Sequence, residues 1–312
     1  MNIKISIFLI LFFGLSFSTI LAQEINTDIL EISSSILKSS NSEDKLKKNE
    51  QLLQIIKEKL SSSVEKIEDL DSTGLIFEMQ SEDKKLQILT WAVLFNDKWE
   101  YFGYIKSYNE SKKIFSVWEL TPVDFLSTIE SKKGHGINNW PAGVYYKLIN
   151  TKYNKRNYYT LLGWLGSNGQ TAYKFIEVLT LSKSGKPSFG KQSFFSKDKK
   201  YSNRFLFGYN ASSNLQLDYG NYNYSEKQWN RKKKQYDIEN FNDNLIVFDF
   251  LVPMYPDLEA IDEFLVPSGN VIDAFIFEKG KWRMKQDIDA RNNKTKKKKE
   301  RKQPQLNLFP DE

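Results

Sequence analysis

The chain contains no cysteine, and this absence excludes several kinds of chemistry at once. No disulfide can cross-link the fold, and no thiolate can act as a nucleophile or as a metal ligand. A lipid-modified N-terminal cysteine is excluded as well. The folded protein must therefore be stabilised by its apolar core, for which a chain of 312 residues supplies ample material.

Histidine is almost absent, because His135 is the only one in the chain. A Ser-His-acid triad would have to use it, and one histidine without cysteine argues against structural zinc. No phosphate-binding glycine loop, dinucleotide fingerprint or HExxH motif occurs. We therefore expect no metal and no cofactor, and we favour a protein that is not an enzyme. Gly134 and Gly136 flank His135, which is typical of close backbone approach to a ligand and equally of a flexible loop tip.

Long hydrophobic runs are also missing, apart from one at the N-terminus. Residues Ile5 to Leu15 are almost entirely apolar, Lys4 precedes them, and Ala22 stands before Gln23. This pattern predicts a signal peptide over residues 1–22, with a retained anchor as the alternative. No later stretch reaches transmembrane length. We expect an exported protein, periplasmic or extracellular, with no membrane span after cleavage.

The net charge of +6 does not indicate a basic folded surface. One charge belongs to the predicted signal peptide, and residues 291–312 hold eight Lys or Arg against three Asp or Glu. The body of the chain is thus neutral, and we expect no nucleic-acid partner. Residues 291–312 are too polar to bury themselves, so we predict a basic disordered tail there.

Helical periodicity is confined to the segment predicted over residues 23–72. Leu46, Leu53, Ile56 and Leu60 recur at intervals of seven, three and four, which places them on one helix face. We interpret this segment as a helix packed on the rest of the protein. A coiled-coil surface for a partner is the alternative.

Aromatic residues are abundant, at 14% of the chain, and they occur in strand-like runs between turn signals. Residues 73–290 therefore predict an antiparallel β domain built of meanders. We expect a mainly β protein with a propeller-like arrangement, and a two-sheet β-sandwich is the alternative. The Asn-, Tyr- and Lys-rich residues 221–242 are interpreted as an insertion between two strands.

The most distinctive stretch runs from Tyr145 to Gly190. Its YYTLLGW sequence at Tyr158–Trp164, the GKPxFG pattern ending at Gly190, and the KW and DIDAR sequences near residues 281–291 resemble an uncharacterised family of secreted proteins of Gram-negative bacteria. That family has no assigned activity, so the resemblance implies export and little else. Its members read Gly-Trp-Asp-Gly where this chain has Leu165, and we interpret that Asp as a turn residue.

Five residues are the candidates for ligand contact: Trp140, His135, Trp229, Asp257 and Glu259. Both tryptophans lie outside the strand patterns and are expected to be exposed, as sugar-stacking residues are. Paired carboxylates could run glycoside hydrolysis, although acidic residues in such loops are usually solvated. We expect a non-catalytic binding or structural module of the cell envelope, with an envelope protein or a glycan as partner. A carboxylate-dependent glycan hydrolase or a glycan-binding module is the alternative.

Overall fold

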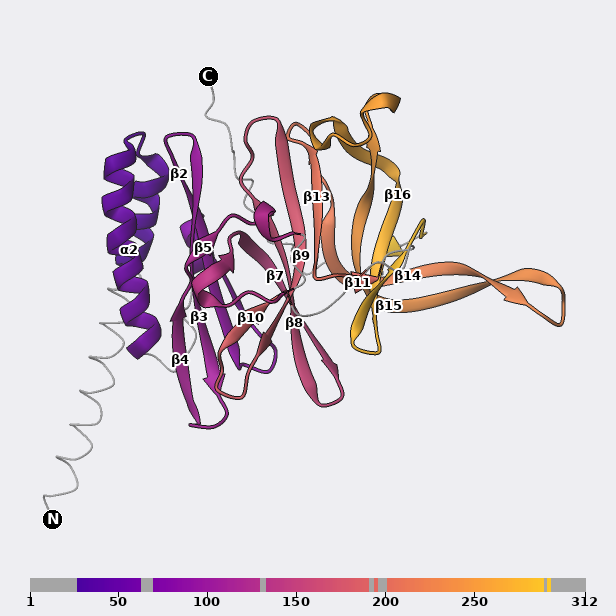
Figure 1. The fold of residues 1–312 in the computed structure, drawn as a ribbon, viewed down its shortest axis with the longest axis horizontal. Helices are drawn as coiled ribbons and strands as arrows, with labels where there is room; N and C mark the ends of the chain where they lie inside the picture. Colours follow the sequence, from indigo (N-terminus) through magenta and orange to yellow (C-terminus); the bar gives the residue numbers. More distant parts are fainter. Residues whose placement is uncertain are drawn as a thin grey trace, which may run out of the picture.

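The protein is a helical pair followed by a series of antiparallel sheets, in a computed structural model that describes residues 27–62, 70–129, 133–190, 194–195, 201–288 and 291–292 (Figure 1). The expectation of a mainly β protein with an N-terminal helical segment is confirmed. The predicted signal peptide lies outside the described residues. No helix among the residues described is long and apolar enough to cross a membrane.

The helical layer comprises residues 27–38 and α2 (Ser42–Ser62). The first sheet has the order β1-β2-β3-β4, with β1 (Phe77–Gln80), β2 (Leu86–Phe95), β3 (Lys98–Asn109) and β4 (Ile114–Glu119). The middle sheet has the order β10-β9-β8-β7, with β7 (Val144–Tyr153), β8 (Arg156–Leu165), β9 (Thr171–Leu181) and β10 (Pro187–Phe189), and β13 (Arg204–Asn210) also pairs with β9.

The third sheet has the order β12-β11-β17-β16-β15-β14-β18. Its strands are β11 (Phe194–Phe195), β12 (Tyr201–Ser202), β14 (Leu217–Asn230), β15 (Gln235–Pro253), β16 (Leu265–Glu278), β17 (Lys281–Lys285) and β18 (Arg291–Asn292). A small parallel pair joins β5 (Pro122–Val123) to β6 (Trp140–Pro141). The 3₁₀ turns are η1 (Leu70–Thr73), η2 (Leu126–Thr128), η3 (Ile137–Asn139), η4 (Pro256–Leu258) and η5 (Asp262–Phe264).

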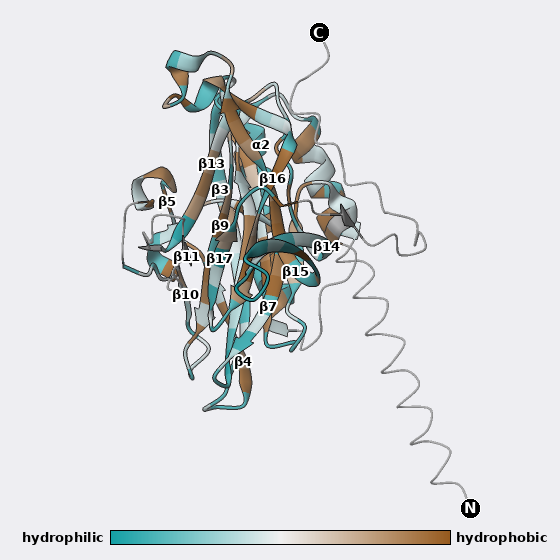
Figure 2. Cartoon of the chain, turned by 90° about the vertical axis from the view of Figure 1, so that its right-hand side faces the viewer, coloured by the Kyte–Doolittle hydropathy of each residue, from teal (hydrophilic) through white to brown (hydrophobic). Residues whose placement is uncertain are grey.

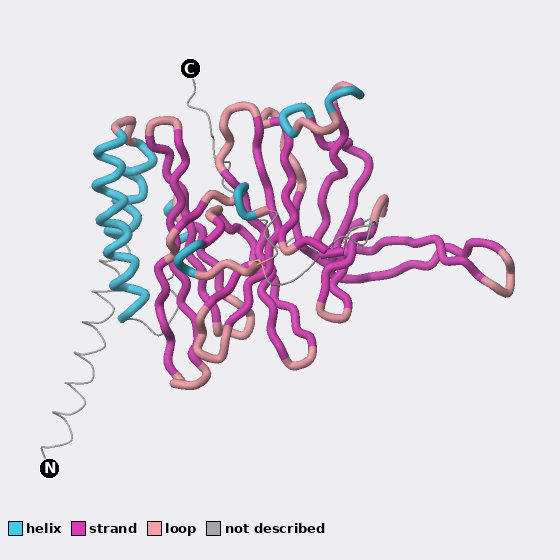
Figure 3. The backbone as a smooth tube through the Cα atoms, in the orientation of Figure 1, coloured by secondary structure: helices cyan, strands magenta, loops and turns pink. Residues whose placement is uncertain are grey.

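The three sheets lie face to face, with the helices on one outer face only (Figure 3). Successive side chains of a strand point to opposite faces of its sheet, so neighbouring residues identify the layers on its two sides. On β2, Leu89 packs with the helices while Ile88 packs with the middle sheet. On β8, Leu161 faces the first sheet and Leu162 faces the third. The arrangement is an open stack rather than a ring of blades, because the middle sheet is apolar on both faces and takes a sheet on each side.

The helical layer is held by buried contacts with β2. Leu52, Ile56 and Leu60 are buried in the core that also contains Trp91, whose Nε1 donates to Asn49 Oδ1 at 2.8 Å. The interpretation of a helix packed on the β domain is therefore confirmed over the coiled-coil alternative.

The segment interpreted as an insertion is a regular hairpin, so that prediction is wrong. β14 and β15 pair without interruption from Leu217–Phe248 to Asn230–Gln235. We call residues 221–243 the arm; it projects beyond the sheets at the right of Figure 1. Asparagines that look loop-like in sequence form a ladder across the two strands, where Asn242 Nδ2 donates to Asn221 Oδ1 at 2.9 Å and to Asn223 Oδ1 at 2.7 Å.

The last described residues extend the third sheet. Arg291 and Asn292 form β18, which pairs with β14 at Asn223 and Tyr222. The prediction that disorder begins at residue 291 is therefore wrong for these two positions. Residues 293–312 lie outside the described residues.

A carboxylate connects the first sheet to the middle sheet. Asp83, in the turn between β1 and β2, accepts hydrogen bonds from Ser81 Oγ at 2.6 Å and from the Lys85 amide at 3.1 Å. Its other oxygen accepts from Asn157 Nδ2 at 2.6 Å and from the Tyr159 hydroxyl at 2.9 Å. Burial alone raises the pKa of Asp83, but these hydrogen bonds outweigh it and hold the pKa below its ordinary value of 3.8.

This lowered pKa predicts a pH dependence of stability that Asp83→Asn removes. A carboxylate whose folded pKa is depressed stabilises the fold above its unfolded pKa, and this contribution is lost as pH falls through the folded pKa. The free energy of unfolding of the wild type should therefore exceed that of the variant most at neutral pH, and the difference should shrink below about pH 4. Urea unfolding at a series of pH values measures it. A difference that stays constant across the acidic range would contradict the assignment.

Candidate functional site

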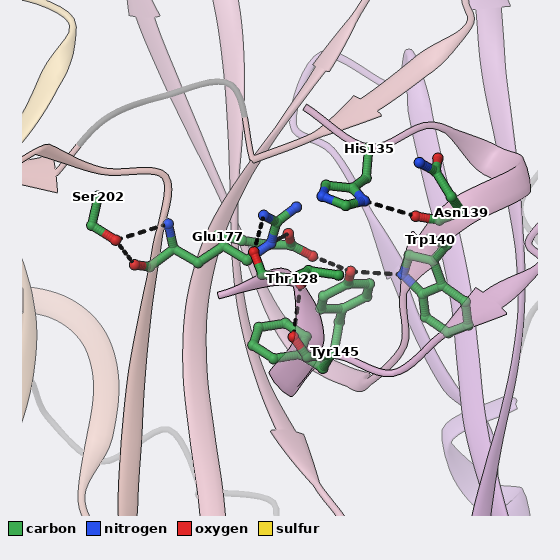
Figure 4. A network of polar contacts seen from close by, with 9 residues as sticks. Thr128, His135, Asn139, Trp140, Tyr145, Glu177 and Ser202 are labelled. Carbon is green, nitrogen blue, oxygen red and sulfur yellow. Dashed lines mark hydrogen bonds and ion pairs between the residues drawn. The ribbon is translucent and has the colours of Figure 1, made fainter. Parts of the chain in front are cut away.

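The most deeply buried charges of the described chain form one ion pair inside the middle sheet (Figure 4). Glu177 on β9 and Arg204 on β13 are register partners. Arg204 Nε donates to Glu177 Oε2 at 3.0 Å, and neither side chain has any solvent exposure. A buried pair of this kind costs free energy to desolvate, so its remaining atoms need partners.

Neighbouring side chains supply most of those partners. The Tyr145 hydroxyl donates to Glu177 Oε1 and accepts from Trp140 Nε1 at 2.9 Å. Arg204 Nη1 donates to the carbonyl oxygen of Thr128 at 3.4 Å. Burial raises the pKa of Glu177, while Arg204 and Tyr145 act in the opposite direction. Because both carboxylate oxygens are bonded and sealed from solvent, Glu177 is a structural residue and not a general acid or base.

His135 lies at the edge of this cluster in an ordered backbone bridge. Its amide donates to the Phe189 carbonyl at 2.9 Å, and the Phe189 amide donates to the His135 carbonyl at 2.8 Å. The backbone of His135 is therefore paired with Phe189. His135 Nδ1 lies 3.2 Å from the Asn139 carbonyl, which can only accept, so Nδ1 carries the proton.

The second ring nitrogen of His135 faces the interior. Burial lowers the pKa of His135 and the charge of Arg204 lowers it further, so the ring is neutral and Nε2 is an acceptor. His135 Nε2 and Arg204 Nη2 are both buried without a hydrogen-bond partner. Nε2 is an acceptor and Nη2 is a donor, and the charge of Arg204 acts on His135.

The exposure expected of the two tryptophans holds for one of them. Trp140 is 0% exposed, so that expectation is wrong: β6 pairs with β5, and the indole ring packs on Tyr145. Trp229 is 52% exposed near the outer end of the arm, as expected. Asp257 in η4 and Glu259 just after it are exposed.

The five predicted contacts do not form one site. Trp140 belongs to the buried cluster and His135 lies at its partly exposed edge, whereas Asp257 and Glu259 follow the C-terminal end of β15. Trp229 pairs with Tyr236, at the opposite end of that strand. Because a strand rises about 3.3 Å per residue, the two ends of β15, which has 19 residues, are roughly 60 Å apart along the strand.

The distinctive Gly163-Trp164-Leu165-Gly166 sequence has a packing role. A Cβ at Gly163 would collide with the Phe175 ring, and one at Gly166 with the Trp99 ring. Leu165 is buried as the last residue of β8, with Gly166 donating its amide to the Tyr101 hydroxyl at 2.8 Å. Leu165 thus ends a strand and contributes to the core, rather than occupying a turn.

A pocket of about 670 Å³ lies at the root of the arm. Its lining includes Tyr224 and Glu226 of β14, Phe241 and Asp243 of β15, and Lys285 of β17. The rings of Tyr224 and Phe241 stack at 5.3 Å, and the Tyr224 hydroxyl donates to Asp243 Oδ2 at 3.0 Å. Glu226 Oε1 lies 2.8 Å from Lys285 Nζ. Aromatic faces beside carboxylate acceptors suit a polyhydroxylated or cationic ligand.

The sequence does not reveal this pocket, because three of its lining residues, Tyr224, Glu226 and Phe241, come from the segment interpreted as an insertion. The available signal was the alternation of Tyr222, Tyr224 and Glu226, a period of two that indicates one face of a strand. Within the residues described, no group of three or more histidine, aspartate or glutamate side chains could hold a metal ion.

Comparison with known proteins gives no relative from which a function could be transferred. No protein-family model, no curated protein and no solved structure matches the chain.

Proposed function

We propose that this is a non-catalytic binding protein of the cell envelope that engages its partner through the arm. The observation that carries the proposal is the exposure of large apolar side chains near the end of the arm: Trp229 is 52% exposed, Tyr236 65% and Ile238 69%. They lie outside all four apolar core clusters of the described chain. Exposed apolar groups gathered on a projecting element are typical of interaction sites. The envelope location rests on the predicted signal peptide.

The arrangement of titratable groups supports binding over catalysis. The most deeply buried carboxylate of the described chain, Glu177, is sealed from solvent, and His135 lies partly exposed at the edge of the same cluster. At the pocket, Glu226 is paired with Lys285, and Glu278 lies 3.2 Å from Arg283 Nη1. Glycoside hydrolysis requires one carboxyl as an acid and another as a nucleophile or base, and Glu226 and Glu278 are both ion-paired, which leaves Asp243 as the pocket carboxylate outside an ion pair.

The pocket favours a second candidate function, the binding of a glycan. Tyr219, Tyr224, Phe241 and Phe277 contribute aromatic surface to its lining, and Asp243 contributes hydrogen-bond acceptors. Sugars are commonly held by aromatic faces and a small number of placed polar groups. In this alternative the arm is a wall of the pocket rather than the binding element.

The two candidates predict different effects of substitution. Trp229→Ala/Tyr236→Ala is expected to weaken binding of the full chain to a purified envelope fraction by tenfold or more, since exposed aromatics dominate interface energies. The matched control is Ile114→Ala, which removes another exposed apolar side chain, on β4. Co-sedimentation with the envelope fraction measures how much of each variant is bound. Far-ultraviolet circular dichroism checks that each variant is folded.

Glu278→Gln tests the pocket in the same assay. The arm proposal expects this isosteric change to leave envelope binding unaltered. If Glu278→Gln abolished binding and the arm variant did not, the glycan candidate would replace the arm as the function. Equal binding by the arm variant and the wild type would contradict the proposal directly.

A further inference from the structure

The three exposed apolar side chains of the arm lie on one of its faces. Trp229 pairs with Tyr236 across the hairpin, and Ile238 is in register with residue 227, two positions further along the same strands. Residues two apart on a strand share a face. The Trp229 and Tyr236 rings meet edge to face with centroids 5.1 Å apart. The end of the arm therefore presents a single small apolar patch with two amphipathic aromatic rings.

Four consecutive basic residues, Arg231 to Lys234, form the loop at the extreme end of the arm, and all four are exposed. Asn230 fixes this loop, because its Oδ1 accepts hydrogen bonds from the amides of Lys232 at 3.0 Å and Lys233 at 3.1 Å. Lys233 Nζ also lies 3.1 Å from Asp237 Oδ2. The basic groups are thus held next to the apolar patch by the turn itself.

The arm carries this end away from the rest of the protein. Tyr222 is buried and pairs with β18, and eight residues separate it from Asn230. At about 3.4 Å per residue, the loop lies roughly 27 Å beyond the sheet. Figure 2 looks toward the arm and shows it as largely hydrophilic, consistent with the asparagine ladder of its stem. Between residues 227 and 239 there are five basic and two acidic residues, although the body of the chain is neutral.

We propose that the end of the arm docks into the headgroup layer of an anionic lipid surface. The inference rests on the proposed function and names its partner class. Tyrosine and tryptophan favour the membrane–water interface, where one part of the ring is apolar and the other is hydrated. Lysine and arginine beside them are attracted to anionic headgroups. The apolar patch and the basic loop lie next to each other at the end of a projecting hairpin. The patch suits the apolar part of the headgroup layer, and the loop suits its negative charge.

The size of the patch favours lipid over a protein partner. A stable protein interface buries about 800 Å² on each side and involves 20–30 residues. Three apolar residues and a four-residue loop at the end of a narrow hairpin fall well short of that. Nucleic acid would be expected to engage a broader basic face, and the neutral body supplies none.

The test uses the full chain with vesicles of phosphatidylcholine alone or containing phosphatidylglycerol. Trp229 fluorescence should shift to the blue with phosphatidylglycerol vesicles, and the shift should be absent in Trp229→Phe. Trp229→Ala/Tyr236→Ala should lower the partition constant tenfold or more, and Lys232→Gln/Lys234→Gln by about fivefold per charge removed. Raised salt should weaken the contribution of the basic residues to vesicle binding, because it screens their attraction to the anionic headgroups. Lys112→Gln/Lys113→Gln removes two exposed charges from another turn and is the matched control.

Several outcomes would overturn the inference. Binding that is unchanged by the arm variants would place lipid affinity elsewhere, because every other part of the chain is identical among them. The same blue shift with inorganic phosphate or glycerophosphate would show a soluble-anion site instead of a lipid surface. Tighter binding to an oligonucleotide than to the vesicles would also refute it. Arm-dependent binding to the envelope fraction without binding to anionic vesicles would reject lipid as the partner and leave the proposed function standing.

Discussion

Replacing Arg204 with methionine is expected to lower the free energy of unfolding by about 3–5 kcal/mol. The substitution leaves Glu177 buried in the middle sheet without its cation, and a buried carboxylate that loses its partner carries a large desolvation cost. Burial already raises the pKa of Glu177, and without Arg204 the pKa rises further, so the group takes up a proton on folding. Urea denaturation followed by circular dichroism measures the loss.

A double substitution separates the ion pair from simple packing. Glu177→Leu/Arg204→Met removes both charges, and its cost is expected to be well below the sum of the two single substitutions, because neither charge is then left unpaired. The single variants are each expected to be strongly destabilised. Additive costs in this cycle would show that the two side chains act independently, which their 3.0 Å contact does not allow.

Trp282→Ala is expected to cost about 3–5 kcal/mol of stability, the range found when large aromatic side chains are removed from cores. Trp282 lies on β17 in the third sheet and has no solvent exposure. Its Nε1 donates to Thr160 Oγ1 of the middle sheet at 2.9 Å, and its ring packs on Phe277 with centroids 5.2 Å apart. Truncation therefore opens a cavity between two sheets and removes the partner of a buried hydroxyl.

Two matched variants locate that effect in the core. Trp282→Phe keeps most of the volume and loses the hydrogen bond, so it should cost about 1–3 kcal/mol. Trp229→Ala removes a tryptophan from the arm, where its ring contacts the exposed ring of Tyr236, and should change stability by no more than about 0.5 kcal/mol. The free energies of unfolding come from the same urea titrations. If Trp282→Ala were as mild as Trp229→Ala, the third and middle sheets would not share a core.

The local parts of this fold are readable in the sequence because short-range chemistry decides them. Asn96 and Asp97 are residue types that favour turns, and both adopt positive φ angles between β2 and β3. The reversal at Asn154 and Lys155 likewise has two positive φ values. Strands such as β2 and β8 can be predicted because their aromatic and aliphatic residues suit a pleated surface.

The misjudged features depend on contacts between distant residues. Trp140 looked like a loop residue because its strand is two residues long and pairs with β5, and only that pairing buries it. Glu177 and Arg204 are 27 positions apart, and a charge in a strand pattern does not reveal its partner. The arm was missed because asparagine disfavours strands in general, whereas here the asparagines bond to one another across the hairpin.

The order of the layers in space follows the order of the chain. Helices come first, then the first, middle and third sheets, except between residues 194 and 210, where the chain alternates between the last two. Each layer therefore packs against the layer that follows it in the chain. The contacts between layers close short loops, so the entropic cost of closing long loops is largely avoided. The middle sheet has two faces to cover, so it is complete only when the C-terminal strands arrive. Assembly of this protein as it leaves the ribosome is expected to proceed layer by layer, with the C-terminal sheet closing the core last.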